Sequence, residues 1–391
     1  LRKLSPESGN NLILTLDVKI QEKLEKLMTG TAEQNMNGSV VVMKVQTGEI
    51  IAITSKPSFD PNKFAAGIST RNRRDLLTDE WHPLQNRSIH GQYPPGSTYK
   101  IVTAIAGLGE GVIKPDTSIF CPGHFKLGRG RYRCWKKSGH GFMNLHDALV
   151  QSCDVYFYTI GHRLGIDTIA KYAKRFGLGR STRLGLSREK KGLVPTTQWK
   201  LLNKKEPWQL GETISASIGQ GFNLVTPIQQ VILMAAVANG GILLKPYLVK
   251  RIEGPEGQIQ KEFFPEIVGQ IGVDPDHLEQ VRKALRDVVN SARGTGKKSR
   301  LKNIIVSGKT GTAQVVRMKS NEELEKGEVI PVKYRDHAWF VAFAPYEKPV
   351  IAVAIIVEHG GHGGATAGPI AGKIFKKYFN LYPPSSSAQT L

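Results

Sequence analysis

The chain has 391 residues and carries 54 Lys and Arg against 33 Asp and Glu, so its formal net charge is +21 at pH 7. This length is ample for a large hydrophobic core and argues against intrinsic disorder, whereas three cysteines are too few for a disulfide-scaffolded fold. No apolar run reaches the roughly 20 residues that cross a bilayer, and the sequence begins at Leu1 rather than Met. We therefore expect a soluble segment of a longer, membrane-anchored protein.

The positive charge is spread over several stretches, and the sequence contains no basic helix with interleaved aromatics, zinc-finger pattern, phosphate-binding glycine loop or ribonucleoprotein motif. We expect no nucleic-acid partner. A solvated basic surface is one interpretation of the charge. Attraction to an anionic membrane face or to an acidic substrate is the other.

The first predicted elements are a linker, a strand, a helix and a hairpin. Residues 1–11 are polar and irregular, as a linker is, and residues 12–16 alternate apolar positions as a strand does. Asp17 is a suitable N-cap for the helix that follows. Residues 39–45 and 50–54 are β-branched runs joined by a Gln-Thr-Gly turn, which predicts a β-hairpin.

The middle of the chain predicts mainly helices, which follow the Pro94-Pro95-Gly96 segment and surround a glycine-rich basic loop at 112–141. Further helices are predicted at 144–164, 166–176, 227–239 and 275–292. Strands return at 304–306, 313–316, 338–343 and 350–357, before a last helix that begins at Pro369 and a tail at 384–391.

Strands at both ends of the chain, with helices between them, predict an α+β fold. We expect an antiparallel sheet covered by helices, with a large, mostly helical insertion. The sheet subdomain would comprise residues 12–61 and 302–380, and the helical subdomain residues 62–301.

Three short motifs of chemically active residues occur in order along the chain. In the first, Ser97-Thr-Tyr-Lys100, residues i and i+3 share one face of a predicted helix. Lys100 can therefore reach the Ser97 hydroxyl, and a desolvated lysine can act as the base that activates a serine nucleophile. The free N–H groups at the helix N-terminus favour the negative charge that develops in such a reaction.

The second and third motifs supply further polar groups. Ser152-Cys-Asp154 offers a hydroxyl for proton relay and a carboxylate that can orient the lysine. Lys309-Thr-Gly-Thr312 is predicted to lie on a strand that follows residues 304–308. Its lysine and the neighbouring threonine can bind a substrate carboxylate, Gly311 would let a substrate backbone approach as an added strand, and the N–H of Thr312 can serve as an oxyanion donor. Alone, each motif also fits a helix cap, a solvated helix edge or a tight turn. The ordered set is what is specific.

With these motifs, the chain resembles the transpeptidase domain of class B penicillin-binding proteins, of the rod-elongation subtype. The resemblance covers residues 12–380 and rests on six segments: Tyr93-Pro-Pro-Gly-Ser-Thr-Tyr-Lys100, Trp135-Lys-Lys-Ser-Gly-His-Gly141, Ser152-Cys-Asp-Val-Tyr-Phe-Tyr158, Gly219-Gln-Gly221 with Thr226-Pro-Ile-Gln229, Lys309-Thr-Gly-Thr-Ala-Gln314, and Asp336-His-Ala-Trp-Phe-Val-Ala-Phe-Ala-Pro345. It implies one transpeptidase domain at 12–383.

The resemblance also implies a mechanism. Ser97 would attack the D-Ala–D-Ala carbonyl of a peptidoglycan stem peptide with Lys100 as base, and an amine of a neighbouring stem peptide would take the acyl group. Ser152 would relay a proton to the leaving group, and the N–H groups of Ser97 and Thr312 would form the oxyanion hole. The substrate carboxylate would be held by Lys309, Thr310 and Thr312. β-Lactams would acylate Ser97.

Partners and location follow from the same resemblance. It implies a periplasmic domain on the inner membrane, anchored by one N-terminal helix outside this sequence. It further implies a membrane glycosyltransferase of the shape-and-division family and a rod-complex scaffold protein as partners. The alternatives are a D,D-carboxypeptidase, a serine β-lactamase, or a β-lactam-sensing domain without enzymatic activity.

One residue departs from the commoner family pattern. The second motif ends in Asp154 where Asn is usual, although the elongation subtype often carries Asp. An ionised aspartate beside two lysines would stabilise their charged forms and oppose a neutral Lys100 base.

All three cysteines lie between positions 121 and 153, with a histidine among them. Cys121, Cys134, His140 and Cys153 form a Cys₃His set, the stoichiometry of a closed structural zinc site. His124 is a rival ligand. A Cys121–Cys134 disulfide with Cys153 free is an alternative, which an oxidising compartment would favour, and three unlinked thiols are another.

Overall fold

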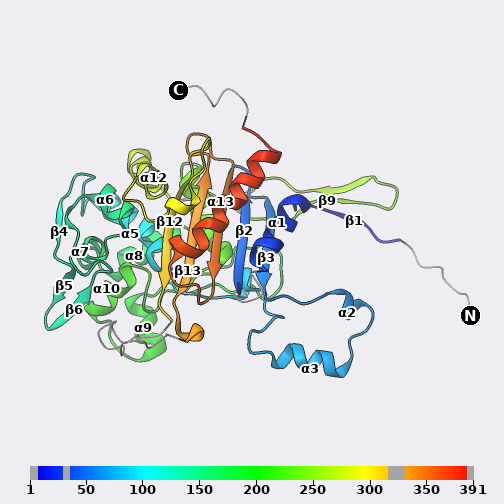
Figure 1. Cartoon of the computed structure of the whole chain (residues 1–391), viewed down its shortest axis with the longest axis horizontal. Helices are drawn as coiled ribbons and strands as arrows, with labels where there is room; N and C mark the ends of the chain where they lie inside the picture. Colours follow the sequence, from blue (N-terminus) through cyan, green and yellow to red (C-terminus); the bar gives the residue numbers. More distant parts are fainter. Residues whose placement is uncertain (1–7, 30–35, 316–330, 385–391) are drawn as a thin grey trace, which may run out of the picture.

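The centre of the molecule is a five-stranded sheet in which every neighbouring pair is antiparallel (Figure 1). The structure, a computed structural model, describes residues 8–29, 36–315 and 331–384. The strand order is β12 (Ser307–Ala313), β13 (His337–Ala344), β14 (Ile351–Val357), β2 (Gly38–Lys44) and β3 (Ile50–Lys56). The sheet therefore joins the two ends of the chain, as expected for the predicted α+β fold.

Both faces of the sheet are buried in hydrophobic cores. Successive side chains of a strand point to opposite faces, so Val41 and Met43 pack into one core and Val40 and Val42 into the other. The sheet strands are consequently almost continuous apolar runs. β12 is the exception, because its sequence is Ser-Gly-Lys-Thr-Gly-Thr-Ala.

Two helices, α1 (Val18–Met28) and α13 (Gly363–Leu381), cover one face of the sheet. As predicted, Asp17 caps α1, accepting a hydrogen bond from the Ile20 N–H. The predicted start of the last helix at Pro369 is wrong, since α13 begins at Gly363. A Cβ on Gly363 would lie 2.1 Å from the Trp339 carbonyl oxygen, so a glycine lets this helix start directly against the sheet.

The opposite face carries the helical part of the chain, whose core includes α5 and α11. Every residue of α5 from Lys100 to Leu108 is buried, which is the pattern of a helix surrounded by protein. The helices and turns here are η1 (Gly96–Tyr99), α5 (Lys100–Gly109), α6 (Leu145–Val150), α7 (Asp154–Leu164), α8 (Ile166–Arg175), α9 (Thr197–Lys204), α10 (Leu210–Ser217), α11 (Pro227–Ala238) and α12 (Pro275–Asn290). The short turn η2 (Lys297–Ser299) packs against α13 instead.

Two sequence predictions in this region are wrong. The loop predicted at 112–141 contains four short strands, β4 (Ile119–Cys121), β5 (His124–Leu127), β6 (Gly130–Arg133) and β7 (Gly141–Met143), which pair as β4–β7 and β5–β6. Their three or four residues are too few to show an alternating pattern. The third motif does lie on a strand, as predicted, because β12 contains residues 309–312. The strand predicted at 304–306 is absent, and the described residues 313–315 of the strand predicted at 313–316 contain only the last residue of β12.

The remaining elements extend from the sheet. A three-stranded sheet joins β1 (Asn11–Leu14), β9 (Val249–Glu253) and β10 (Ile259–Glu262), and β8 (Ile242–Leu244) pairs with β11 (Ile267–Gln270). An arm after β3 contains α2 (Asn62–Ala65) and α3 (Thr70–Thr78) and protrudes from the body (Figure 1). Two further short elements are α4 (Arg87–His90) and η3 (Val332–Tyr334).

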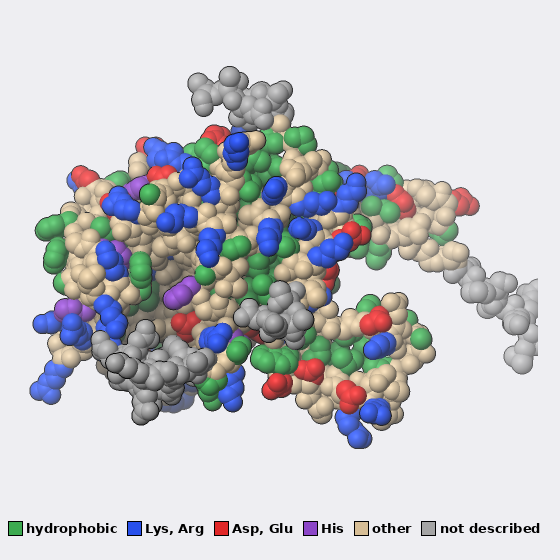
Figure 2. Space-filling view, viewed as in Figure 1, with side chains coloured by type: hydrophobic (Ala, Val, Ile, Leu, Met, Phe, Trp, Pro, Cys, Tyr) green, Lys and Arg blue, Asp and Glu red, His purple; other side chains and the backbone are tan. Residues whose placement is uncertain are grey.

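Lys and Arg side chains are spread over the face of the body seen in Figure 2. Within the described ranges, no helix is both long enough and apolar enough to cross a membrane. Residues 1–7 of the predicted linker and residues 385–391 of the predicted tail lie outside the described residues.

The packing of α13 on the sheet predicts the cost of a cavity. Ile374 is fully buried in the core between α13 and the sheet, so we expect Ile374→Ala to lower the free energy of unfolding by about 2–5 kcal/mol. Urea denaturation would measure this loss. Lys373→Ala, at an exposed position of the same helix, is the control and should change stability by less than about 0.5 kcal/mol. Equal losses in both variants would contradict the packing described.

Candidate active site

The first motif lies at a turn that is pressed against the edge of the sheet. Ser97 belongs to the 3₁₀ turn η1, and α5 follows it directly at Lys100. Gly96 has φ = +55°, and a Cβ there would lie 2.4 Å from the carbonyl oxygen of Thr312. Only a glycine permits this backbone conformation and this approach together. The first and third motifs are thereby held in contact.

The ammonium group of Lys100 is enclosed within the protein. Lys100 has no exposed surface, and its Nζ donates to the Ser152 carbonyl oxygen at 2.9 Å, to Ser152 Oγ at 3.2 Å and to Asp154 Oδ1 at 2.7 Å. A buried charge needs such a partner to be tolerated. The structure thus brings the first and second motifs together as well.

The first motif predicted that the Lys100 amine reaches the Ser97 hydroxyl, but the amine is hydrogen-bonded to the second motif instead. In the described part of the chain, no side-chain hydrogen bond joins Lys100 Nζ to the half-buried Ser97 hydroxyl. The carboxylate of Asp154 attracts the ammonium group more strongly than a neutral hydroxyl does. Lys100 is therefore oriented by the second motif.

The second motif sits in the break between α6 and α7. Ser152 has φ = +55°, a conformation that is uncommon for a residue other than glycine. Asp154 starts α7, where the helix N-terminus favours a negative charge, and its Oδ2 accepts a hydrogen bond from the Trp135 N–H at 2.9 Å. Burial raises the pKa of the Asp154 carboxyl, and the nearby charge of Lys100 opposes that rise.

The third motif adds a second buried amine. Lys309 Nζ donates to Ser152 Oγ at 2.9 Å and to the Thr310 carbonyl oxygen at 3.2 Å. The Ser152 hydroxyl therefore lies between Lys100 and Lys309. Burial, together with the charge of Lys100, holds the pKa of Lys309 well below the usual range of a lysine.

The remaining predicted residues lie on the same strand. The Thr310 hydroxyl is 2.9 Å from that of Thr295, a residue the sequence did not single out. A Cβ on Gly311 would lie 3.0 Å from the Pro95 carbonyl oxygen and 3.0 Å from Thr98 Cγ2. A Cβ there would also lie 2.9 Å from Trp339 Cβ on β13, so Gly311 is enclosed both by the neighbouring strand and by the turn that carries Ser97.

Two residues of the site were quoted in the sequence motifs without a role. Trp135, besides its contact with Asp154, donates its indole N–H to the Ser152 carbonyl oxygen at 3.0 Å. Gln220 donates its side-chain amide to the Thr312 carbonyl oxygen at 2.9 Å. Both contacts depend on tertiary structure, and the only sequence signal was that each residue lies in a segment of the family resemblance.

The predicted metal ligands also come together. One possible ligand atom from each of Cys121, Cys134, His140 and Cys153 lies within 4.8 Å of the others. Nδ1 of His140 is 3.6 Å from the Cys121 sulfur and 3.5 Å from the Cys134 sulfur. Typical Zn–S and Zn–N bonds at a tetrahedral angle would separate such atoms by about 3.6 Å. The donor set thus fits a zinc ion.

The three cysteines are free thiols, and His124 is not part of their cluster. All three cysteines are buried and none forms a disulfide. A hydrogen bond between Cys134 and Cys153 lowers the pKa of Cys134 and raises that of Cys153. His124 lies outside the cluster, where its Nδ1 contacts Arg131.

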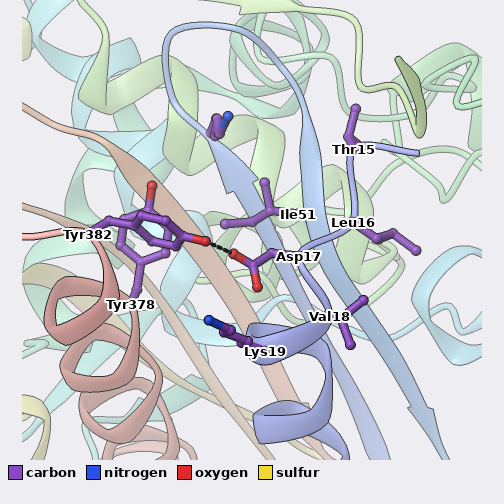
Figure 3. Close-up of a pocket in the computed structure, with 9 residues that line it drawn as sticks. Thr15, Leu16, Asp17, Val18, Lys19, Ile51, Tyr378 and Tyr382 are labelled. Atoms are coloured by element: carbon purple, nitrogen blue, oxygen red, sulfur yellow. Dashed lines mark hydrogen bonds between the residues drawn. The ribbon is translucent and has the colours of Figure 1, made fainter. Parts of the chain in front are cut away.

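A separate groove of about 480 Å³ lies away from the motifs. It is formed where α1 begins, beside β2 and β3, and by the end of α13 (Figure 3). The Tyr382 hydroxyl donates to Asp17 there. Because none of the predicted site residues lines this groove, we place the candidate active site at the three motifs.

Comparison with known families agrees with this placement. A family profile described as the penicillin binding protein transpeptidase domain matches residues 38–379. The chain belongs to this family. The match covers the central sheet from β2 to β14, most of α13 and all three motifs.

Curated relatives point to the rod-elongation subtype. The chain is 37% identical to the peptidoglycan D,D-transpeptidase MrdA of Haemophilus influenzae over 390 residues, which is 98% of this chain and 58% of that protein. It is 38% identical to MrdA of Acinetobacter baumannii over 94% of this chain and 54% of that protein. The chain therefore spans less than two thirds of the length of these relatives.

Solved structures of the family have the same fold. PBP2 of Pseudomonas aeruginosa, in complex with WCK 5153, superposes with a TM-score of 0.84 at 36% identity and covers 96% of this chain and 77% of that chain. PBP2 of Helicobacter pylori superposes with a TM-score of 0.84 at 32% identity, over 97% of this chain and 66% of that chain. The predicted fold class is confirmed.

The two buried lysines are expected to differ in their effect on stability. Lys100→Met would leave the buried Asp154 carboxylate without its charge partner and should lower the free energy of unfolding by about 3 kcal/mol. Lys309→Met removes a buried amine that has no carboxylate hydrogen-bonded to it and should leave stability unchanged or raise it. Urea denaturation at pH 7 would measure both changes.

The pH dependence provides the control. A lowered pKa means that the folded state binds this proton less tightly than the unfolded state does, so the cost of Lys309 is greatest at low pH and shrinks as pH rises toward the ordinary lysine range. The stability gap between Lys309→Met and the wild type should shrink likewise. A gap that does not change with pH, or an equal loss in both lysine variants, would contradict this assignment.

Proposed function

We propose that the chain is the transpeptidase domain of a peptidoglycan D,D-transpeptidase that cross-links stem peptides during cell elongation and is inhibited by β-lactams. The observation that carries this proposal is the Ser152 hydroxyl between the two buried lysines, beside the turn that holds Ser97. This arrangement offers a nucleophile, a base and a proton relay within one enclosed site. Names of the relatives support the same activity.

Acylation would begin at Ser97. Lys100 must be neutral to act as the base, and its proton can pass to Asp154 Oδ1, which its Nζ contacts at 2.7 Å. Ser97 Oγ then attacks the carbonyl carbon of the penultimate D-Ala while the neutral Lys100 takes the hydroxyl proton, and the tetrahedral intermediate carries a negative oxygen. The N–H and C=O of one strand residue point to the same edge of the strand. Since the Thr312 carbonyl oxygen accepts from Gln220 at the free edge of β12, the Thr312 N–H also faces that edge, where it can stabilise the oxyanion with the Ser97 N–H.

Collapse of the intermediate breaks the peptide bond and releases D-Ala. The leaving nitrogen receives a proton through Ser152, whose hydroxyl contacts both amines. An amine of a second stem peptide then attacks the acyl-enzyme, forms the cross-link and frees Ser97. Lys309, Thr310 and Thr312 would bind the terminal carboxylate of the acyl donor.

We also propose the domain division and the cellular setting. Residues 12–383 would form the transpeptidase domain, with residues 12–61 and 302–380 as its sheet subdomain and residues 62–301 as its helical subdomain.

The domain would work on the periplasmic face of the inner membrane, anchored by a single N-terminal helix. PBP2 of Helicobacter pylori has been solved in complex with MreC. By analogy, a rod-complex scaffold would bind the full-length protein, and a membrane glycosyltransferase of the shape-and-division family would be its second partner.

Zinc is the proposed structural metal. Cys121, Cys134, His140 and Cys153 would hold it, and four protein ligands leave no position for a catalytic water. The ion would fix the turn around Cys153, which lies between Ser152 and Asp154 in the chain. It would thereby hold the second motif in place without taking part in the reaction.

Covalent labelling by benzylpenicillin tests the proposed function. We expect intact-mass analysis to find one penicillin adduct on the wild type and none on Ser97→Ala, because the acyl bond forms at Ser97 Oγ. Ser187→Ala, at an exposed serine, should keep the adduct. An adduct that persists for hours supports a transpeptidase, rapid loss of the adduct indicates a β-lactamase, and an unchanged adduct on Ser97→Ala would overturn the proposal.

Elemental analysis tests the zinc site. We expect one zinc ion per chain in the wild type, loss of zinc in Cys134→Ser, and retained zinc in the matched variant His124→Ala. Chelation should lower the melting temperature and the rate of acylation together, because the ligands flank the second motif. A metal-free protein with a Cys121–Cys134 disulfide would refute the zinc site.

A further inference from the structure

The side chain of Gln220 lies at the free edge of β12, where a peptide strand could bind. β12 is the outermost strand of the central sheet. Gln220 Nε2 donates to the Thr312 carbonyl oxygen at 2.9 Å, and Gln220 Oε1 accepts from the Gln314 N–H at 3.4 Å. An added strand would bond to these same two backbone groups through its own N–H and C=O groups.

The backbone that carries Gln220 is firmly held. Its N–H donates to the Ser215 carbonyl oxygen at 3.0 Å, and its carbonyl oxygen accepts from the buried Asn223 side chain at 3.3 Å. The preceding residue, Gly219, accepts a hydrogen bond from the Gly96 N–H at 2.9 Å, and a Cβ on it would lie 2.3 Å from the Gly96 carbonyl oxygen. Gln220 is thus presented to β12 from a turn that is packed against the Ser97 turn.

The contact with Thr312 has a consequence for the acyl donor, given the proposed function on which this step rests. In the hydrogen-bonded pairs of an antiparallel ladder, the two opposed residues exchange both of their hydrogen bonds. A donor residue whose carbonyl oxygen is bound by the Thr312 N–H would therefore give its own N–H to the Thr312 carbonyl oxygen. In the ligand-free chain, the amide of Gln220 already donates to that oxygen.

We propose that Gln220 is a specificity-determining residue that occupies the acyl-donor edge of β12 and yields the Thr312 carbonyl oxygen to the amide N–H of the incoming acyl donor. A ligand with such an amide must displace the Gln220 side chain, whereas a ligand without one leaves it in place. Gln220 is half-buried, so its side chain has room to leave once the donor binds. Gln220 therefore determines how much an acylamino group on the ligand increases the rate of acylation.

Two penicillins that differ in this group provide the test. Benzylpenicillin has an acylamino substituent, and penicillanic acid lacks it. The second-order rate constants of acylation of Ser97 by both would be measured through competition with a fluorescent penicillin, for the wild type, Gln220→Ala and Gln220→Glu. Gln220→Glu keeps the size of the side chain but, when ionised, cannot donate to Thr312. Its charge acts on the carboxylate of both ligands alike, so it cancels in the ratio of the two rate constants.

We expect the ratio of benzylpenicillin to penicillanic acid to rise in both variants by roughly threefold to tenfold, the range of one net hydrogen bond. Gln258→Ala, at an exposed position between β9 and β10, should leave the ratio unchanged. A merely structural role for Gln220 would slow both ligands equally, and a ratio within about twofold of the wild type in either variant would overturn the inference. Absence of any acylation in the wild type would instead refute the proposed function.

Discussion

The site depends on one buried ion pair, that of Lys100 with Asp154. Without the carboxylate, an ammonium group with no exposed surface would have only neutral partners in the core. The pair fixes Lys100 toward the second motif, and the Ser152 hydroxyl then extends the contact to Lys309. The Asp that departs from the commoner family pattern is therefore the residue on which the geometry of the other two motifs rests.

Close backbone contacts bring the three motifs together. Gly96 meets Thr312 on one side and Gly219 on the other, so the nucleophile turn is wedged between the edge strand and the turn after α10. A side chain at either glycine would push these segments apart. The Cys₃His cluster lies on the opposite side of the second motif, where Cys153 faces the other members of the cluster while its neighbours Ser152 and Asp154 face the lysines.

The sequence predicted what depends on residue type and periodicity, and it missed what depends on tertiary contact. The cap at Asp17, the β-hairpin and the α+β class could be derived from local patterns, whereas the grouping of the three motifs in one site rested on the family resemblance. The strands β4 to β7 could not, because each has three or four residues of mixed burial. The role of Gln220 was equally hidden, since Thr312 lies 92 residues away from it in the chain.

Because the two lysines are enclosed, direct proton transfer between them and bulk water is restricted. Lys100 and Lys309 have no exposed surface, and Ser152 is 6% exposed, so this relay is largely shut off from bulk water. In the proposed mechanism, the proton removed from Ser97 would return to the leaving nitrogen along the same internal path. The serine proton would then not pass through the medium while the bonds are made and broken, and proton exchange with the medium would be limited to the amino groups of the released D-Ala and of the acceptor.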